Sequence, residues 1–143
     1  MGLTIRDAQA ADAGRIAGLL TQLGYPTQPS AVEARLERLA IVGDRVVVAD
    51  LDGLAVGLAH LQVAPAIERD RPAAKIGALV VDEAHRGQGV GRALVQALED
   101  DARARGCEQL FVTTAEHRDA AHAFYERVGL ERTGRRYGRT LSE

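Results

Sequence analysis

Glycine and arginine residues cluster over residues 86–92, where the sequence reads Arg-Gly-Gln-Gly-Val-Gly-Arg. An apolar run over residues 76–81 precedes them, and from Val90 onward apolar residues follow the spacing of one helix face. The loop therefore ends where backbone N–H groups lack intrahelical partners and the helix dipole is positive. Because glycines let a ligand approach that backbone closely, this stretch is suited to binding phosphate.

The spacing of the glycines excludes two common phosphate-binding motifs. A P-loop ends in Gly-Lys followed by Ser or Thr, and this stretch contains no lysine. The dinucleotide motif G-x-G-x-x-G also fails, because neither Gly87 nor Gly89 is followed by a glycine at the sixth position. The pattern that fits is R/Q-x-x-G-x-G, filled by Arg86, Gly89 and Gly91. The alternative is an ordinary glycine-rich turn between a strand and a helix.

Composition limits the class of protein that carries this loop. The 143 residues suit one domain with a single core, so residues 1–143 are predicted to form one domain. A net charge of −2 gives no long-range attraction for nucleic acid or an anionic membrane. A single cysteine excludes an internal disulfide and a cysteine-cluster metal site, and no metal is expected. Without a membrane-length apolar run or a signal-peptide pattern, the expected location is cytoplasmic.

Helices and strands alternate around the loop. The predicted elements of the first part are a strand at 3–6, a helix capped by Asp12, a helix with a capping box at Ser30 and Glu33, and strands at 45–51 and 54–63 joined by Asp52-Gly53. They are followed by a strand at 76–81, a helix from Val90 to about Arg105, a strand at 108–114 and a helix capped by Asp119. Residues 130–134 and 136–141 are predicted as weak strands or one hairpin. This order, β-α-α-β-β-β-α-β-α-β(β), predicts an α/β fold with a mixed central sheet flanked by helices.

The loop resembles the pyrophosphate loop of the GNAT superfamily of acetyl-CoA-dependent N-acetyltransferases. A second segment, residues 119–130, is similar to the superfamily motif N-x-x-A-x-x-L/F-Y-x-x-x-G-F. It matches at Ala121, Phe124, Tyr125 and Gly129. Since the element order is also that of the superfamily, the resemblance covers nearly the whole chain. It implies a GNAT-like fold.

The resemblance also implies where acetyl-CoA binds. In the superfamily the cofactor lies between the motif strand and the next strand, which splay apart. Backbone groups of Leu79, Val80 and Val81 would then bind the pantetheine arm, and a bulge in this strand would open the wedge. The pyrophosphate would be bound by Arg86, Gly87, Gln88, Gly89, Val90, Gly91 and Arg92. Arg118 stands where the superfamily has Asn, and it is expected to contact CoA.

Tyr125 is the expected catalytic acid, because the second motif places the superfamily's tyrosine there. Acyl transfer from a thioester to an amine expels a thiolate, which a phenol can protonate. Ordinary thiol and phenol pKa values are about 8.5 and 10, so complete proton transfer is uphill by about 2 kcal/mol. Tyr125 is therefore expected to donate a hydrogen bond as charge develops on sulfur. The alternative is a tyrosine that only packs its ring on the core.

The general base is where the sequence departs from the superfamily. Lys75 stands where many members have Glu, and a lysine is protonated at neutral pH. Lys75 is either an exposed strand end or a cation that favours an acceptor bearing a carboxylate. His60, Glu116 and His117 are alternative bases, although each also fits a surface or structural role. If there is no base, acceptors with a lower amine pKa are favoured.

The expected function is transfer of the acetyl group from acetyl-CoA directly to a primary amine of a small molecule, such as an amino acid, a polyamine or an antibiotic-like compound. Two alternatives remain open: a protein or peptide N-acetyltransferase, and a non-catalytic sensor that binds acyl-CoA. The loops at 25–29 and 64–73 should decide between small and peptide acceptors. A homodimer is expected from the resemblance, with no nucleic-acid or membrane partner.

Overall fold

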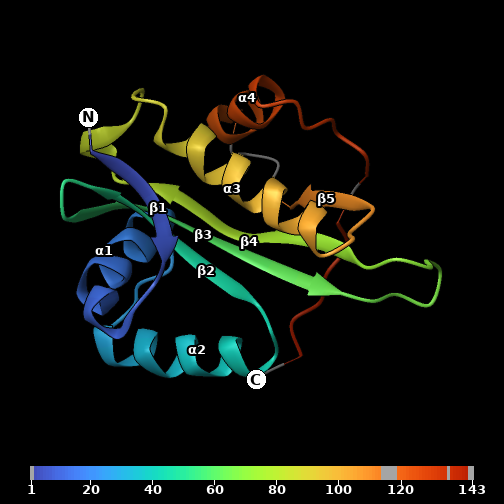
Figure 1. The fold of residues 1–143 in the computed structure, drawn as a ribbon, viewed down its shortest axis with the longest axis horizontal. Helices are drawn as coiled ribbons and strands as arrows, with labels where there is room; N and C mark the ends of the chain where they lie inside the picture. Colours follow the sequence, from blue (N-terminus) through green and yellow to red (C-terminus); the bar gives the residue numbers. More distant parts are fainter. Residues whose placement is uncertain (1, 114–118, 135, 142–143) are drawn as a thin grey trace. The chain divides into compact units, whose positions relative to one another are not determined.

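The computed structural model describes residues 2–113, 119–134 and 136–141 (Figure 1). The chain forms two compact units, Met1–Val112 and Thr113–Glu143. The elements of the first unit are β1 (Leu3–Asp7), the 3₁₀ turn η1 (Ala10–Asp12), α1 (Ala13–Leu23), α2 (Pro29–Ile41), β2 (Arg45–Leu51), β3 (Leu54–Ala64), β4 (Ala73–Val81), the 3₁₀ turn η2 (Glu83–His85), α3 (Val90–Ala104) and β5 (Gln109–Val112). The second unit contains α4 (Asp119–Arg127).

The sheet follows the order of the chain, β1-β2-β3-β4-β5. Strands β1 to β4 pair with one another in antiparallel fashion, and β5 runs parallel to β4. A parallel neighbour requires a crossover connection, which α3 provides. The turn between β2 and β3 contains Asp52 at φ 52° and Gly53 at φ 94°, as a tight two-residue hairpin requires. The predicted mixed α/β fold is confirmed.

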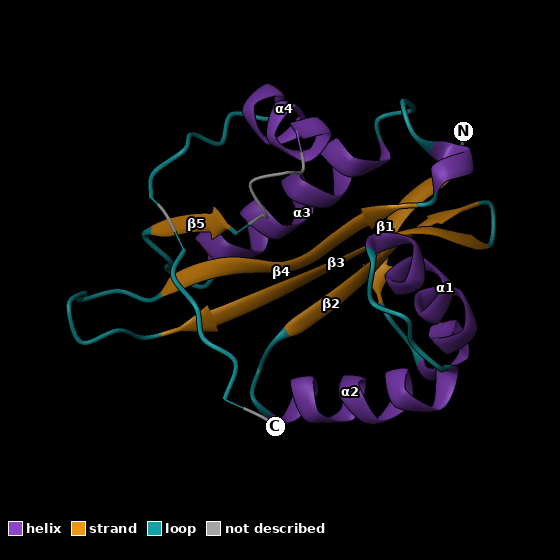
Figure 2. Ribbon diagram, turned by 180° about the vertical axis from the view of Figure 1, so that it is seen from behind, coloured by secondary structure: helices purple, strands orange, loops and turns teal. Residues whose placement is uncertain are grey.

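Helices cover both faces of this sheet. Figures 1 and 2 show α1 and α2 on one face and α3 on the other. On the first face the buried cluster includes Ile16, Leu19, Val32, Val48, Leu58 and Val80. On the second face α3 approaches closely, because a Cβ on Gly57 would lie 3.0 Å from the side chains of both Val90 and Leu94. Leu94 and Leu98 are fully buried, and each such leucine contributes about 1.5–3 kcal/mol to folding.

The start of α1 lies where the sequence predicts it, with Asp12 as the N-cap residue, but the cap is not made by the side chain, and the start of α2 differs from the prediction. Asp12 does not cap α1 with its side chain, because its carboxylate binds Arg6 at 2.9 Å and the Gln9 N–H at 2.8 Å. The predicted capping box at Ser30 is wrong, since the N-cap residue is Gln28 and α2 begins at Pro29. Proline is favoured at the first position of a helix because that N–H has no intrahelical partner.

The end of α1 agrees with the prediction and directs the next loop toward the sheet. Gly24 has φ 113°, and the Tyr25 N–H donates to the Leu20 carbonyl at 2.9 Å. This left-handed cap reverses the chain after α1. As a result, the loop from Tyr25 onward lies on the face of the sheet that α1 and α2 cover.

The second unit is a helix followed by irregular chain. Its α4 (Asp119–Arg127) is the helix predicted in this stretch, and Gly129 has φ 91° just after its end. Residues 130–134 and 136–141 have no regular secondary structure, so the weak strands predicted there are wrong. These stretches are rich in arginine and glycine and lack the alternation of apolar residues that stabilises a strand.

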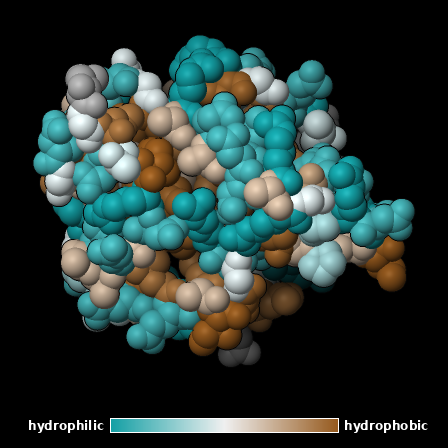
Figure 3. Space-filling view, viewed as in Figure 1, coloured by the Kyte–Doolittle hydropathy of each residue, from teal (hydrophilic) through white to brown (hydrophobic). Residues whose placement is uncertain are grey.

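Hydrophilic residues cover most of the face seen in Figure 3, with smaller apolar areas between them. The exposed large apolar side chains include Ile41, Val42 and Ile67. In the part of the chain that the structure describes, no helix combines the length and apolar character needed to cross a bilayer.

Candidate active site

The glycine loop connects β4 to α3 as predicted. Gly87 and Gly89 have φ 79° and 83°, in the left-handed region that favours glycine. Gly89 is the N-cap of α3 and has no side chain, so the first N–H groups of the helix receive no side-chain cap. A Cβ added at Gly87 or Gly89 would meet nothing within 4 Å, which leaves open space over this backbone. Exposed N–H groups at a helix start, flanked by open space, form a site for an anion.

Charged side chains fix the start of the loop. Asp82 caps the short turn η2, and its carboxylate binds Arg15 at 3.0 Å and Gln22 at 3.3 Å, both on α1. The hydrogen bond from Arg15 lowers the pKa of Asp82, and hydrogen bonds from the Ala84 N–H and Gln22 act in the same direction. The loop is therefore tied to α1. Arg86 Nε also donates to the Val81 carbonyl, at the end of β4, at 3.2 Å. Both Arg86 and Arg92 are exposed.

Pairing between β4 and β5 stops partway along β4. The two strands pair from Ala73 and Gln109 to Ile76 and Val112, whereas β4 continues to Val81. Among the described residues, the edge of β4 over 77–81 therefore has no partner on β5. This is the part of β4 where the wedge is expected, and it includes Leu79, Val80 and Val81.

A bulge in β4 accompanies the opening. Ile76 pairs with Leu61 and Leu79 pairs with Ala59, so Gly77 and Ala78 together lie opposite His60. Two residues opposite one is the geometry of a β-bulge, which bends a strand and increases its twist. The bulge expected for the wedge is thus present, two residues before the segment on which the sequence predicted it.

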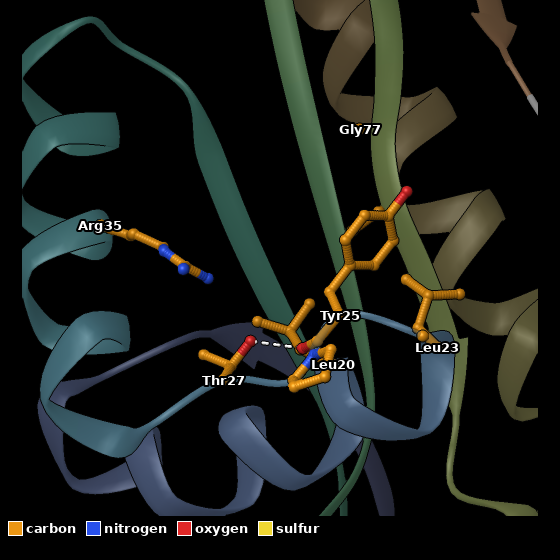
Figure 4. Close-up of a pocket in the computed structure, with 9 residues that line it drawn as sticks. Leu20, Leu23, Tyr25, Thr27, Arg35 and Gly77 are labelled. Carbon is orange, nitrogen blue, oxygen red and sulfur yellow. Dashed lines mark hydrogen bonds between the residues drawn. The ribbon is translucent and has the colours of Figure 1, made fainter. Parts of the chain in front are cut away.

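A cavity of about 590 Å³ lies beside this bulge (Figure 4). Gly77 and Ala78 form part of its wall, together with the end of α1 and the loop that carries Tyr25, Pro26 and Thr27. Thr27 Oγ1 donates to the Tyr25 carbonyl, which holds the loop closed on itself. Arg35 extends from α2 into the same cavity. A cavity of this volume is in the range of small-molecule sites.

A second, smaller cavity of about 200 Å³ lies along the same strand. Lys75 lines it, with Gln62 from β3, Phe111 from β5 and the loop residues after β3. Lys75 pairs with Gln62 on one side and Phe111 on the other. The two loops named from the sequence, at 25–29 and 64–73, thus each line one cavity. Lys75 lies in the smaller cavity rather than beside Arg35.

His60 lies between these two cavities without lining either of them. Its Nε2 lies 2.8 Å from Asp44 Oδ2, and the Asp44 side chain is only 5% exposed. A Cβ on Gly77 would lie 2.4 Å from His60 Nδ1, so the ring occupies the space that a side chain at residue 77 would take. When Nε2 donates its proton to Asp44, Nδ1 is the unprotonated nitrogen of the neutral ring.

The remaining predicted site residues belong to the second unit. Tyr125 lies on α4, where its ring contacts Phe124 edge-on with centroids 5.8 Å apart. Arg118, Glu116 and His117 lie outside the described residues. The roles assigned to Tyr125 and Arg118 therefore stay predictions. No group of three or more metal-ligating side chains occurs in the described ranges 2–113, 119–134 and 136–141.

The sequence predicted that the loop with Tyr25 would line the acceptor site, but sequence reasoning missed Arg35, the charged side chain of the larger cavity. A signal for Arg35 was present, because residues one turn away on its helix, Ala31, Val32, Arg38 and Leu39, include no acid. An arginine without an acidic neighbour on its own helix is available for another partner. The loop with Tyr25 could be predicted because Gly24, just before it, ends α1.

Known proteins resemble the chain in sequence and in fold. The model of the Acetyltransferase (GNAT) family matches residues 15–130. Glucosamine 6-phosphate N-acetyltransferase 1 of Oryza sativa subsp. japonica is 36% identical over 76% of this chain and 70% of its own length. N-alpha-acetyltransferase RimI of Mycobacterium tuberculosis is 37% identical over 96% of this chain and 85% of its own length.

A solved structure of the aminoglycoside N-acetyltransferase AAC(6')-Iy, in complex with a bisubstrate analogue of CoA and acetylneamine, has a TM-score of 0.85. It is 20% identical and covers 99% of both chains, which shows the shared fold. The glycine loop between β4 and α3 lies within the residues 15–130 that the family model matches. The chain therefore belongs to the GNAT family of acetyltransferases and is an acyl-CoA-dependent N-acyltransferase.

Proposed function

We propose that the protein transfers the acetyl group of acetyl-CoA directly to a primary amine of a small molecule. The observation that carries this proposal is the arrangement along β4. The glycine loop follows the strand, no described residue of β5 pairs with the strand over 77–81, and the cavity of about 590 Å³ is lined by Gly77 and Ala78. One strand thus connects a site for the donor with a cavity for the acceptor.

The donor side uses the residues expected from the family. The N–H groups and arginines of residues 86–92 bind the pyrophosphate, and the backbone of Leu79, Val80 and Val81 binds the pantetheine arm. Tyr125 donates a hydrogen bond to the departing thiolate, and Arg118 contacts CoA. Acetyl-CoA is consumed as a co-substrate and supplies the activated acyl group.

The acceptor amine must lose a proton in the reaction. Of the described residues that line either cavity, none is Asp or Glu. This supports the view that the acceptor arrives largely as a free amine. An amine with a pKa near 7.7–8.0 is substantially unprotonated at pH 7.5, whereas a lysine-like amine near 10.4 is almost wholly protonated.

A peptide N-terminus is the second candidate acceptor. Its support is the RimI relative, whose similarity extends over 96% of this chain. A peptide would have to leave the cavity past Tyr25, which is 63% exposed at its wall. A non-catalytic acyl-CoA sensor is the third possibility, and it is the one that turnover excludes.

We also propose that the protein is a cytoplasmic homodimer, as expected for a small member of this family. Tyr137 and Leu141 are 89% and 91% exposed, and apolar side chains this accessible support an interface in the second unit. Light scattering at micromolar concentration measures the mass directly, and a monomer there contradicts the homodimer.

The test of the acceptor class is a turnover screen with thiol release as the readout. Small primary amines and short peptides with free N-termini are offered in parallel at the same concentration of acetyl-CoA. We expect a small amine to give the highest kcat/KM. A peptide that exceeds every small amine by tenfold would replace the small-molecule proposal with the peptide one.

A further inference from the structure

Arg35 is the charged side chain of the acceptor cavity. It extends from α2 toward the loop with Tyr25 and Thr27, as Figure 4 shows. Every other described residue that lines the cavity is apolar or uncharged. A cation at one wall of a mostly apolar cavity fixes the orientation of a ligand that carries the opposite charge.

No carboxylate within the described residues neutralises Arg35. It makes no hydrogen bond or ion pair there, in contrast to Arg6, Arg15 and Arg45, which bind carboxylates at 2.8–3.0 Å. A guanidinium is always charged and presents donors that match a carboxylate or phosphate in two-point contact. The free donors of Arg35 therefore favour an anion in the cavity.

The smaller cavity is lined by a second positively charged side chain, that of Lys75. Lys75 is two residues before Gly77 on β4, so each of the two cavities along this strand is lined by one cation. The nearby carboxylate of Asp44 lines neither cavity and is bound by His60. An acceptor with several positive charges would meet a like charge in either cavity, which is unfavourable.

We propose that the acceptor amine also carries an anionic group, a phosphate or a carboxylate, and that Arg35 binds this group in the larger cavity. The inference rests on the proposed function and narrows it. Polyamines and aminoglycosides are thereby disfavoured, and phosphorylated amino sugars and amino acids are favoured. The Tyr25 hydroxyl offers a further hydrogen bond within the same cavity.

Paired acceptors test the charge requirement and separate its two sources. The phosphate pair is glucosamine 6-phosphate and glucosamine, and the carboxylate pair is an α-amino acid and its amide. Spermidine and kanamycin represent polycations. We expect the anionic member of at least one pair to have a kcat/KM at least tenfold above its neutral partner, and the polycations to be the poorest substrates. The pair that shows the difference identifies the source.

Substitution of Arg35 assigns the effect to this residue. Arg35→Ala should raise KM for the anionic acceptor at least tenfold with kcat within about threefold, because a remote binding contact acts on the ground and transition states alike. Arg35→Lys should recover part of the loss. Arg38→Ala, one turn further on the same helix and outside the cavity, is the control and should leave both parameters unchanged. Melting temperatures show whether each variant is folded.

Failure of this inference differs from failure of the proposed function. Equal use of neutral and anionic acceptors, preference for a polycation, or an unchanged KM in Arg35→Ala would overturn the anion site while acetyl transfer stands. If no amine is acetylated, calorimetry with glucosamine 6-phosphate and inorganic phosphate is performed on the CoA-bound protein. Binding that Arg35→Ala abolishes would support the anion site alone, and absence of binding would overturn it.

Discussion

Gly77 has room for a hydrogen atom only, because the ring of His60 lies where a larger side chain would begin. The ring cannot retreat easily, since Nε2 is held by Asp44 at 2.8 Å and the Asp44 side chain is buried. The bulge at the cavity wall thus depends on a glycine, a histidine and an aspartate that are distant in sequence. A short sequence motif cannot predict contacts between residues that are so far apart in the chain.

Gly77→Ala should destabilise the protein by about 1–3 kcal/mol, the usual cost of overpacking. For a chain of this length, the melting temperature should fall by about 2–8 °C. The matched control is Gly18→Ala in α1, where an added Cβ meets nothing within 4 Å and the backbone is helical. It should stabilise the helix by about 0.5–1 kcal/mol. Equal effects of the two substitutions in thermal unfolding would contradict the packing described here.

The ion pair between Arg6 and Asp12 predicts how stability depends on pH. Two hydrogen bonds of 2.9 Å from Arg6 lower the pKa of Asp12. A carboxylate with a lowered folded-state pKa stabilises the fold at pH values above its unfolded pKa, about 3.9, and this stabilisation is lost as the pH falls through the folded value. The melting temperature should therefore be steady from pH 7 to about pH 5 and fall below about pH 4.

Asp12→Asn isolates this contribution to stability. It should lower the melting temperature at pH 7 and reduce the further fall between pH 5 and pH 3, because the group that titrates is gone. The control is Asp70→Asn, at an exposed residue between β3 and β4 that forms no ion pair with any described residue. This variant should follow the wild type. An Asp12→Asn curve parallel to that of the wild type would show that this pair does not govern the acid limb.

Tyr125→Phe tests the acid assigned by resemblance. The hydroxyl is expected to stabilise charge that exists only in the transition state, so turnover should fall by about 10²–10⁴-fold while acetyl-CoA affinity is retained. Single-turnover measurements keep product release from hiding the effect. A loss below about threefold would leave Tyr125 with packing against Phe124 as its role.

At the scale of elements, local signals predicted the parts of the fold that local chemistry controls. The β2–β3 hairpin, the C-terminal glycine of α1 and the start of α3 each depend on neighbouring residues, and each agrees with the structure. The predicted side-chain caps of α1 and α2 were wrong for a related reason, although α1 starts at the predicted place. Asp12 and Ser30 have the right type for a cap, but Arg6 binds the first and Pro29 comes before the second.

The candidate site also has one part that the local sequence predicts and one part that it does not. The glycine loop is local, so its position and its positive φ values could be predicted from spacing. The larger cavity could not, because its wall comes from α1, α2 and β4, whose packing depends on contacts between distant residues. The sequence shows that Arg35 has no acidic residue one turn away on its helix, but nothing in the sequence places it in the same cavity as Gly77.

The loop that joins β4 to α3 gives the prediction at this scale. Gly89→Asp should abolish the rise in melting temperature caused by CoA, which is about 2.7 kcal/mol of stabilisation at 100 times the dissociation constant. The substitution adds a carboxylate and a Cβ where the pyrophosphate binds. The control is Gly43→Asp, at φ 84° in the turn after α2, which introduces the same backbone strain away from the loop. It should lower the melting temperature and keep the CoA response, and loss of the response in both variants would contradict the assignment.

At the scale of the molecule, the family match spans residues 15–130 and so includes parts of both compact units. The single domain over residues 1–143 stays a prediction. The net charge of −2 leaves long-range electrostatics weak, so the choice of acceptor depends on local cations such as Arg35 and Lys75. Family membership defines the donor, and the residues that line the cavities define the acceptor.

Direct acetyl transfer to an amine is tested most directly by measuring free CoA thiol and acetylated amine in the same reaction. The wild-type protein should release one thiol for each acetylated amine, at a rate that depends on the amine, and release almost none without it. Thiol release that continues at the same rate without an amine would show hydrolysis instead. Tight CoA binding with neither product would contradict the account and leave a sensor of acyl-CoA.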